Sequence, residues 1–264
     1  MIDPYHFANP ILTTIFNRRS VRNFDEMPIP QNIKDLIITG AMRAPTAGNM
    51  MLYSILEVDS QEIKTALAKT CDNQPFIATS PFILLFLADY QKWYDYFEFC
   101  NVKEMCSRLE LQYNDPKESN LLMCFVDAVI AAQNAVITAE SQGIRSCYIG
   151  DIMEHYETHR DLFQLPKYAF PAAMVCFGYP KHPEPLGQIT KRFEKNLIFH
   201  KNSYAPWSLS RIREFHADIT TTRKIPTKYS ELKNVGQYIY KFKSGAEFSK
   251  EMNRSVKEML KNWR

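Results

Sequence analysis

The sequence predicts an α+β domain with a helical C-terminal extension. Two patterns carry this prediction: segments of helical and strand periodicity alternate up to residue 178, and roughly the last sixty residues show helical periodicity only. No stretch rich in Gly or Ser divides the 264 residues. We therefore expect one domain over residues 1–264, of which about residues 205–264 form the extension.

In the first 88 residues, caps and prolines mark the ends of the apolar segments. Asn9 before Pro10 starts a short helix that ends at the basic cluster Arg18-Arg19-Ser20, and Pro45 closes the second helix. The expected elements are this first helix, a helix over 31–43, a strand over 53–58, a helix over 61–70 and a buried strand over 82–88.

The later segments are more apolar. The pattern over 125–142 is apolar nearly all round, which predicts a helix buried on most sides and ended by Gly143. The remaining expected elements are a helix over 90–113, strands over 147–150 and 172–178, and helices at about 206–222 and 246–262. Five aromatic residues begin the 90–113 helix and fit either core packing or a substrate pocket: Trp93, Tyr94, Tyr96, Phe97 and Phe99.

Composition and charge exclude several classes of protein. Apolar residues make up 45% and charged residues 23% of a soluble globular chain, and the net charge of +3 comes without basic blocks. The longest wholly apolar run, residues 82–88, is far shorter than the ~20 residues of a membrane-spanning helix. No secretory signal opens the sequence, and six cysteines without a C-x-x-C pair predict free thiols. We expect a cytoplasmic protein that binds neither nucleic acid nor membrane.

Common catalytic and metal motifs are missing from the sequence. None of the eight glycines forms a G-x-G pair, which excludes the Rossmann fingerprint and the P-loop, and neither G-x-S-x-G nor C-x-x-C occurs. His155 and His159, four residues apart on a predicted helix, fit either two metal ligands or a solvated face. Because no third ligand is indicated, we expect no metal.

The strongest local signal is Arg18-Arg19-Ser20-Val21-Arg22-Asn23-Phe24, just after the first helix. Guanidinium groups form forked hydrogen bonds to phosphate oxygens, and the serine hydroxyl adds another donor. Two interpretations stay open on these residues alone: a phosphate site and a solvated basic helix end.

Other blocks of sequence accompany this one in a fixed order. The six blocks are Arg18–Phe24, Ala44–Met50, Asp127–Ile144, Tyr148–Gly150, Phe177–Pro180, and Arg192 with His200–Tyr204. Together they resemble the nitroreductase family of FMN-dependent NAD(P)H oxidoreductases over about residues 9–205, most closely its oxygen-insensitive, NADPH-preferring nitro/flavin reductase branch. The resemblance implies a central mixed β-sheet flanked by helices, and a homodimer with one FMN per subunit at the interface.

The resemblance also implies which residues bind FMN. Those at the phosphate are Arg18, Arg19, Ser20, Arg22 and, from the other side, Arg192. Those at the flavin ring are Gln74 and the backbone of Tyr148, Ile149 and Gly150. A loop that reaches the flavin from the partner subunit supplies Thr46, Ala47, Gly48, Asn49 and Met51.

Structural interpretations compete with some of these roles. Tyr148 and Ile149 fit a core strand, Gly150 a turn, and Gln74 a surface loop. Three polar residues of the buried helix are expected to bond neighbouring backbone: Asp127, Gln133 and Asn134.

Two positions depart from the family pattern. Thr190, beside Lys191, stands where relatives usually carry Lys before the closing Arg, and Met51 stands where they usually carry Gln. The first bears on phosphate affinity and the second on hydrogen bonding at the pyrimidine edge of the flavin.

The activity implied by the resemblance is a ping-pong cycle. NADPH or NADH reduces FMN, and a nitroaromatic, a quinone or a free flavin then takes the electrons. Because the flavin carries the chemistry, no catalytic side chain is expected. The alternatives are a flavin-binding regulator without turnover and another reductive branch of the fold, a dehalogenase or a flavin destructase.

Overall fold

The computed structural model describes residues 9–182 and 192–263, which fall into two compact units. The first unit comprises Met1–Gly187 together with Glu251–Arg264, and the second comprises Gln188–Lys250. The predicted extension thus contains most of the second unit, and its last residues return to the first. That the two units form one domain stays a prediction.

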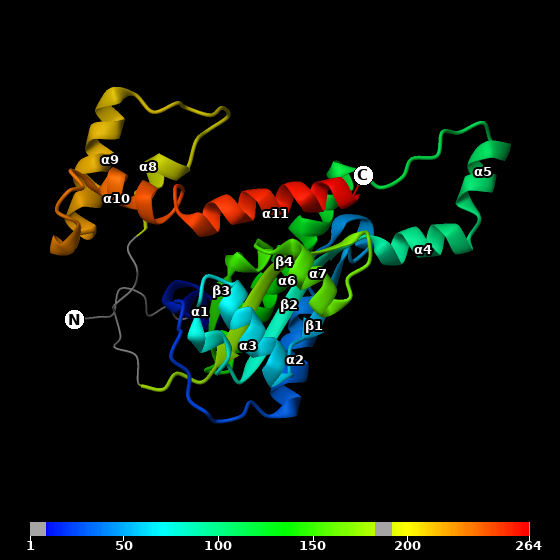
Figure 1. Cartoon of the computed structure of the whole chain (residues 1–264), viewed down its shortest axis with the longest axis horizontal. Helices are drawn as coiled ribbons and strands as arrows, with labels where there is room; N and C mark the ends of the chain where they lie inside the picture. Colours follow the sequence, from blue (N-terminus) through cyan, green and yellow to red (C-terminus); the bar gives the residue numbers. More distant parts are fainter. Residues whose placement is uncertain (1–8, 183–191, 264) are drawn as a thin grey trace. The chain divides into compact units, whose positions relative to one another are not determined.

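A four-stranded sheet forms the centre of the first unit (Figure 1). Its strands are β1 (Tyr53–Glu57), β2 (Phe82–Asp89), β3 (Arg145–Ile149) and β4 (Ala169–Gly178), in the spatial order β1-β2-β4-β3. Neighbouring strands are antiparallel. Two isolated bridges add a parallel contact between Ser20 and Ser146 and an antiparallel contact between Phe24 and Pro180. The strand pairing is therefore mixed, as predicted. The α+β fold class is confirmed.

The two central strands are wholly buried because apolar layers cover both faces of the sheet. Side chains alternate along β2: Phe82, Leu84, Phe86 and Ala88 join the layer under α2 and α6, whereas Ile83, Leu85 and Leu87 join the layer under α3. The register shifts between Phe86 and Leu87, opposite Pro171. Proline has no N–H for the ladder, so an irregularity at this point keeps the pairing intact.

Most predicted helices of the first unit are confirmed to within a few residues. They are α1 (Pro10–Asn17), α2 (Gln31–Met42), α3 (Gln61–Thr70), α6 (Glu118–Ser141), α7 (Tyr156–Phe163) and the end of α11 (Glu247–Trp263). α6 begins seven residues before the predicted start at 125. Leu121 and Cys124, three residues apart, are buried in that extra turn, and the Asn120 side chain accepts from the Lys117 amide.

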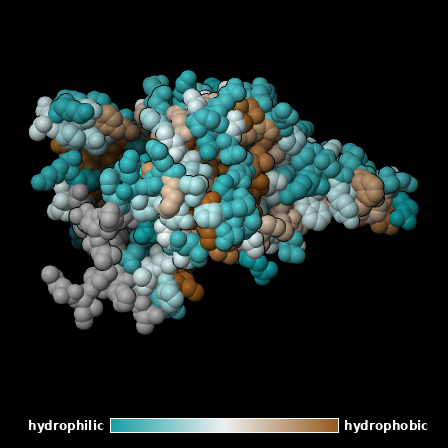
Figure 2. Space-filling view, turned by 90° about the horizontal axis from the view of Figure 1, so that it is seen from below, coloured by the Kyte–Doolittle hydropathy of each residue, from teal (hydrophilic) through white to brown (hydrophobic). Residues whose placement is uncertain are grey.

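The single helix predicted over 90–113 is wrong. The segment forms α4 (Gln91–Phe99) and α5 (Val102–Arg108), and residues 109–117 are not helical. Asn101 takes a left-handed conformation with φ of 53°, which ends α4, and Asn tolerates that conformation better than most residues. The two helices project from the sheet as an arm, and Figure 2 shows apolar side chains on it; Phe99 is 83% exposed.

α6 is the long helix of the core. It contacts all four strands and α2, and among the described residues it is the one helix long and apolar enough to cross a membrane by length and composition. Its packing against the sheet accounts for that composition. The predicted burial on most sides is confirmed over 125–142, where Val126 and Gln133 are exposed among buried and half-buried neighbours, whereas Leu122 and Met123 before this range are exposed.

The second unit is helical, as predicted. It contains α8 (Lys195–Ile198), α9 (Leu209–Thr222), α10 (Val235–Phe242) and the first residues of α11. The sequence did not indicate α8 or α10. α10 is held by a cluster of rings, in which Phe242 lies 4.6 Å from Tyr229 and 4.8 Å from Tyr238 between ring centroids.

Gly40 sets the distance between α2 and α6, which yields a stability prediction. A Cβ added there would lie 2.2 Å from Thr138 Oγ1 on α6. Gly40→Ala is therefore expected to lower the free energy of unfolding by about 1–3 kcal/mol through overpacking, although Ala favours a helix by about 1 kcal/mol over Gly. Urea unfolding measures this. In a Thr138→Ala background the loss should shrink, because only the contact with the Cβ of residue 138, at 3.0 Å, remains. An undiminished loss there would show that the clash is not its cause.

Candidate functional site

The predicted phosphate-binding segment runs along the edge of the sheet. After α1 ends at Asn17, Val21 N donates to Ser146 O at 3.0 Å and Asp25 N donates to Tyr179 O at 2.8 Å. Gly178 permits the approach, since an added Cβ would lie 2.6 Å from Phe24 Cγ. Residues 18–25 are thereby fixed beside β3.

Two arginines of this segment, Arg18 and Arg22, act electrostatically on the thiol of Cys147 on β3. All six cysteines are free thiols, as predicted, and Cys147 is buried. Burial raises its pKa, while Arg22, a hydrogen bond with Ser20, and Arg18 lower it. Burial likewise raises the pKa of Tyr148, and Arg18 opposes it. Arg19 is half-buried in the same segment. The structure therefore brings Arg18, Ser20 and Arg22 together at β3.

The residues predicted at the flavin ring lie at the other end of β3. Tyr148 and Ile149 end the strand and Gly150 follows in a short 3-10 turn (Gly150–Met153). A Cβ added to Gly150 would meet no atom within 4 Å, so its backbone faces open space. Gln74 joins it from a distant part of the chain, because its Nε2 donates to Asp151 Oδ2 at 2.7 Å.

The predicted loop 46–51 is held by Asp127 of α6. The Asp127 carboxylate accepts from Ala47 N at 3.1 Å and from Leu52 N at 3.2 Å, and Thr46 Oγ1 accepts from Met51 N at 2.8 Å. The Asn134 side chain donates to Gly40 O. Asp127 and Asn134 thus both form hydrogen bonds with backbone groups, as predicted. Gln133 instead accepts from the Tyr148 hydroxyl.

Three residues of this loop are left-handed: Gly48, Asn49 and Met51, with φ between 49° and 57°. Gly48 and Asn49 are exposed, whereas Met51 is half-buried against the core. Trp93 of α4 donates to Met50 O at 2.7 Å. Part of the aromatic segment thus supports the loop, while Tyr96 and Phe99 stay exposed.

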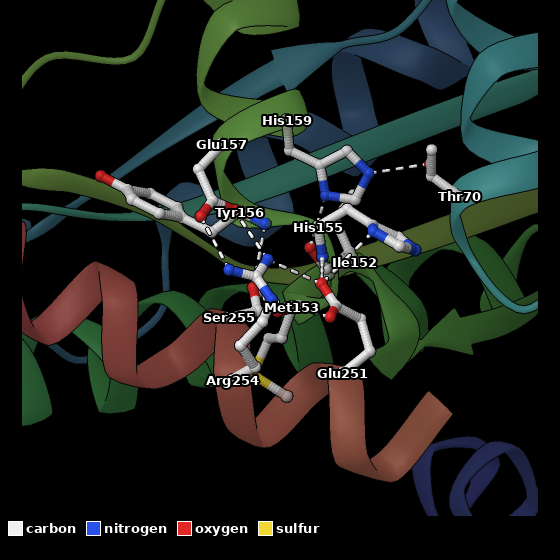
Figure 3. A network of polar contacts seen from close by, with 10 residues as sticks. All are labelled: Thr70, Ile152, Met153, His155, Tyr156, Glu157, His159, Glu251, Arg254 and Ser255. Atoms are coloured by element: carbon white, nitrogen blue, oxygen red, sulfur yellow. Dashed lines mark hydrogen bonds and ion pairs between the residues drawn. The ribbon is translucent and has the colours of Figure 1, made fainter. Parts of the chain in front are cut away.

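A polar network between α7 and α11 also holds Met153, the last residue of the turn that begins at Gly150 (Figure 3). Ser255 of α11 donates to Met153 O at 2.6 Å and accepts from Tyr156 N at 2.9 Å. Arg254 forms a forked pair with Glu157, both contacts 2.8 Å long, which lowers the pKa of Glu157 to about 2. Trp263, buried at the end of α11, donates to Lys117 O at 3.1 Å.

The solvated face predicted for both histidines is wrong for His159. This side chain is fully buried, with Nδ1 2.9 Å from Ile152 O and Nε2 2.8 Å from Thr70 Oγ1. Since a carbonyl only accepts, Nδ1 carries the hydrogen and Nε2 accepts from Thr70. His155 is half-exposed and 3.3 Å from Glu251. Among the described residues, no group of three or more His, Cys, Asp and Glu side chains is placed to hold a metal ion.

Two buried titratable groups of this region have displaced pKa values. Burial, followed by Asp151, Asp72 and Glu251, raises the pKa of Glu154 to about 7, and its Oε1 has no hydrogen-bond partner within the described part of the chain. Burial lowers the pKa of His159 to about 4, although its bond to Ile152 O opposes the shift.

Arg192 belongs to the second unit, where it precedes α8. Its predicted role at the phosphate stays a prediction, and Thr190 and Lys191 lie outside the described residues. Three residues of the last sequence block, His200, Lys201 and Ser203, line a hollow of about 470 Å³ in this unit. Arg211 and Glu214, which the sequence did not single out, also line it.

Sequence reasoning missed Asp151 and left Trp93 open between core packing and a substrate pocket. Both hold predicted residues, Gln74 and the 46–51 loop respectively. The sequence signal that could have identified Asp151 is its position directly after Gly150, at the end of a predicted strand. Nothing local indicated its bond to Gln74, 77 residues away.

Comparisons with known proteins agree on one family. The model of the nitroreductase family matches residues 15–179. An FMN reductase (NADPH) of Bacillus subtilis is 28% identical over 74% of this chain and 75% of its own. An NADPH-dependent oxidoreductase of Staphylococcus saprophyticus is 30% identical over 71% of each chain. The crystal structure of nitroreductase A from Vibrio parahaemolyticus, 22% identical, covers 97% of this chain and 98% of its own with a TM-score of 0.76, which shows a shared fold.

The two displaced pKa values predict a balanced pH dependence of stability. The raised pKa of Glu154 gives a stabilising contribution that is present below its ordinary value of 4.5 and is lost as the pH rises through about 7. The lowered pKa of His159 gives one that is present above 6.5 and is lost as the pH falls through about 4. Between pH 4.5 and 6.5 the two oppose each other, so the free energy of unfolding should change little.

Glu154→Gln should remove this balance. Its free energy of unfolding is expected to fall as the pH drops from 6.5 to 4, by up to about 1.4 kcal/mol per pH unit. Urea unfolding at a series of pH values measures the slope. Glu104→Gln, at an exposed position of α5, is the control and should follow the wild type. Equal slopes in the two variants would contradict the assignment.

Proposed function

The chain belongs to the nitroreductase family, and we propose that it is an FMN-dependent oxidoreductase that takes electrons from NADPH or NADH. Relatives named as an FMN reductase (NADPH) and an NADPH-dependent oxidoreductase support this function. The observation that carries it is the backbone contact of Ser20 and Val21 with Ser146, which brings the arginine-rich segment to the strand that leads to Gly150.

The chemistry of these residues fits FMN. The two guanidiniums and the hydroxyl match a single terminal phosphate, and no glycine-rich loop is present for a pyrophosphate. At the ring end, the bare backbone of Gly150 leaves room for a flat ring, and Gln74 is anchored beside it. Arg18, Arg19, Ser20, Arg22 and Arg192 would hold the phosphate, and Gln74 with Tyr148, Ile149 and Gly150 would meet the ring.

When bound, FMN supplies the redox chemistry, accepting a hydride from the nicotinamide and passing electrons to an acceptor. The protein would position the cofactor and neutralise its phosphate. We propose small acceptors: nitroaromatics, quinones or free flavins. No side chain is assigned as an acid or base.

We also propose a cytoplasmic homodimer in which the loop Thr46–Met51 reaches the FMN of the partner subunit. Exposed apolar side chains on two helices in contact support the dimer. They are Ile11, Leu12 and Ile15 on α1 and Leu122, Met123 and Val126 on α6. A second copy would remove this apolar surface from water.

The proposed function is tested with purified, flavin-loaded protein. It should be yellow and dimeric and should release FMN on denaturation. Excess NADPH without oxygen should bleach it, and a quinone should restore the colour, because both half-reactions occur at one site. Bound FMN that NADPH and NADH leave oxidised would favour a flavin-binding regulator, and recovery of FAD would contradict the phosphate assignment.

The open space at Gly150 gives a separate prediction about the ring. Gly150→Ala should leave the unfolding free energy of FMN-free protein within about 0.5 kcal/mol of wild type, because the new Cβ meets no protein atom. FMN affinity should fall by tenfold or more, since an overpacked contact costs about 1–3 kcal/mol. Fluorescence titration with FMN measures the affinity.

Gly143→Ala is the matched control. Its Cβ also meets no atom within 4 Å, but φ is +74°, so this variant should lose about 1 kcal/mol of stability and keep its FMN affinity. Unchanged FMN affinity in Gly150→Ala would place the ring elsewhere.

A further inference from the structure

Gln74 is held so that its side chain can only accept a hydrogen bond from a ligand. Its Nε2 donates to Asp151 Oδ2 at 2.7 Å and to Cys71 O at 3.1 Å, which uses both amide hydrogens. Among the residues the structure describes, no donor reaches Oε1. The half-buried side chain therefore offers a carbonyl oxygen and no N–H.

The orientation of this amide follows from its two partners. A carboxylate and a backbone carbonyl present only lone pairs, so each requires an N–H from Gln74. Turning the amide over would replace both hydrogen bonds by contacts between Oε1 and another acceptor. Cys71 O is part of the backbone, which leaves the Asp151 carboxylate as the side chain that fixes the orientation.

Asp151 is placed to act at the ring end of the site. It directly follows Gly150, and its carboxylate is close enough to the thiols of Cys71 and Cys147 to raise their pKa values. Its backbone carbonyl accepts from Glu154 N at 3.0 Å within the 3-10 turn. Its bond to Gln74 joins two separate segments that both have predicted roles at the flavin ring.

We propose that Asp151 is a positioning residue that keeps the carbonyl oxygen of Gln74 turned toward the flavin ring. The proposal rests on the proposed function, because FMN is the ligand that Oε1 would meet. An oxidised flavin ring has one N–H, whereas the reduced ring has one more when it is anionic and two more when it is neutral. A fixed acceptor therefore favours the reduced ring, whereas an amide free to turn also offers an N–H to the acceptor atoms of the oxidised ring.

The charge of Asp151 by itself has the opposite effect. The ring gains negative charge on reduction, so removing a nearby carboxylate makes reduction easier. Asp151→Asn therefore separates the two causes by sign: loss of positioning lowers the reduction potential, and loss of charge alone raises it.

The experiment measures the potential of bound FMN by anaerobic equilibration with a reference dye. Asp151→Asn is expected to lower the ratio of affinities for reduced and oxidised FMN by about tenfold, which is about 30 mV for a two-electron couple. In a Gln74→Met background, which has no amide to orient, the same substitution should not lower the potential. Asp72→Asn is the matched control, because Asp72 also acts on Glu154 but has no bond to Gln74.

A potential that rises or stays unchanged in Asp151→Asn would overturn the proposal, as would an equal fall in the Gln74→Met background. Thermal unfolding of the FMN-free variants checks that they fold, and Asp151→Ser is measured if Asp151→Asn does not. A wild type that binds no FMN, or whose FMN resists reduction by NADPH and NADH, would overturn the proposed function as well. A yellow, reducible wild type with no coupling between Asp151 and Gln74 would overturn this inference alone.

Discussion

Burial of the sheet on both faces is the constraint on which the rest of the structure depends. β2 and β4 have no solvated face, so helices must cover both sides and polar groups are restricted to strand ends and edges. β3 lies at one edge of the sheet, where polar groups can approach a strand. One side of it pairs with β4, and the chain at Ser20–Val21 takes up part of the other side. This second contact fixes a segment rich in arginine beside a buried strand.

The result is that groups of both charges act on β3. Arg18 and Arg22 lower the pKa of the Cys147 thiol, whereas Asp151, which directly follows the turn residue Gly150, raises it. Hydrogen bonds between α7, α11 and Met153 hold the turn after β3 in place.

The sequence was sufficient for the elements whose signals are local. Asn9 with Pro10 and Pro45 placed α1 and α2, Gly143 placed the end of α6, and unbroken apolar runs placed β2 and β4. It failed at Asn101, because a left-handed residue inside a helical pattern leaves no trace in the periodicity, and at His159, whose burial depends on Thr70 and Ile152. Family resemblance supplied the predicted site residues. The bonds that organise them, Gln74 to Asp151 and Asp127 to the 46–51 loop, join residues more than 70 positions apart.

The return of α11 to the first unit has a consequence for the order of folding. Met259 and Trp263 belong to the same core cluster as Phe82 and Phe177, although the whole second unit separates them in sequence. During synthesis, this layer therefore waits for residues beyond 250 before it can close, and the chain carries an incomplete core until then. Contacts of such long sequence separation form slowly. The second unit is thus made, and free to fold, before the first is complete.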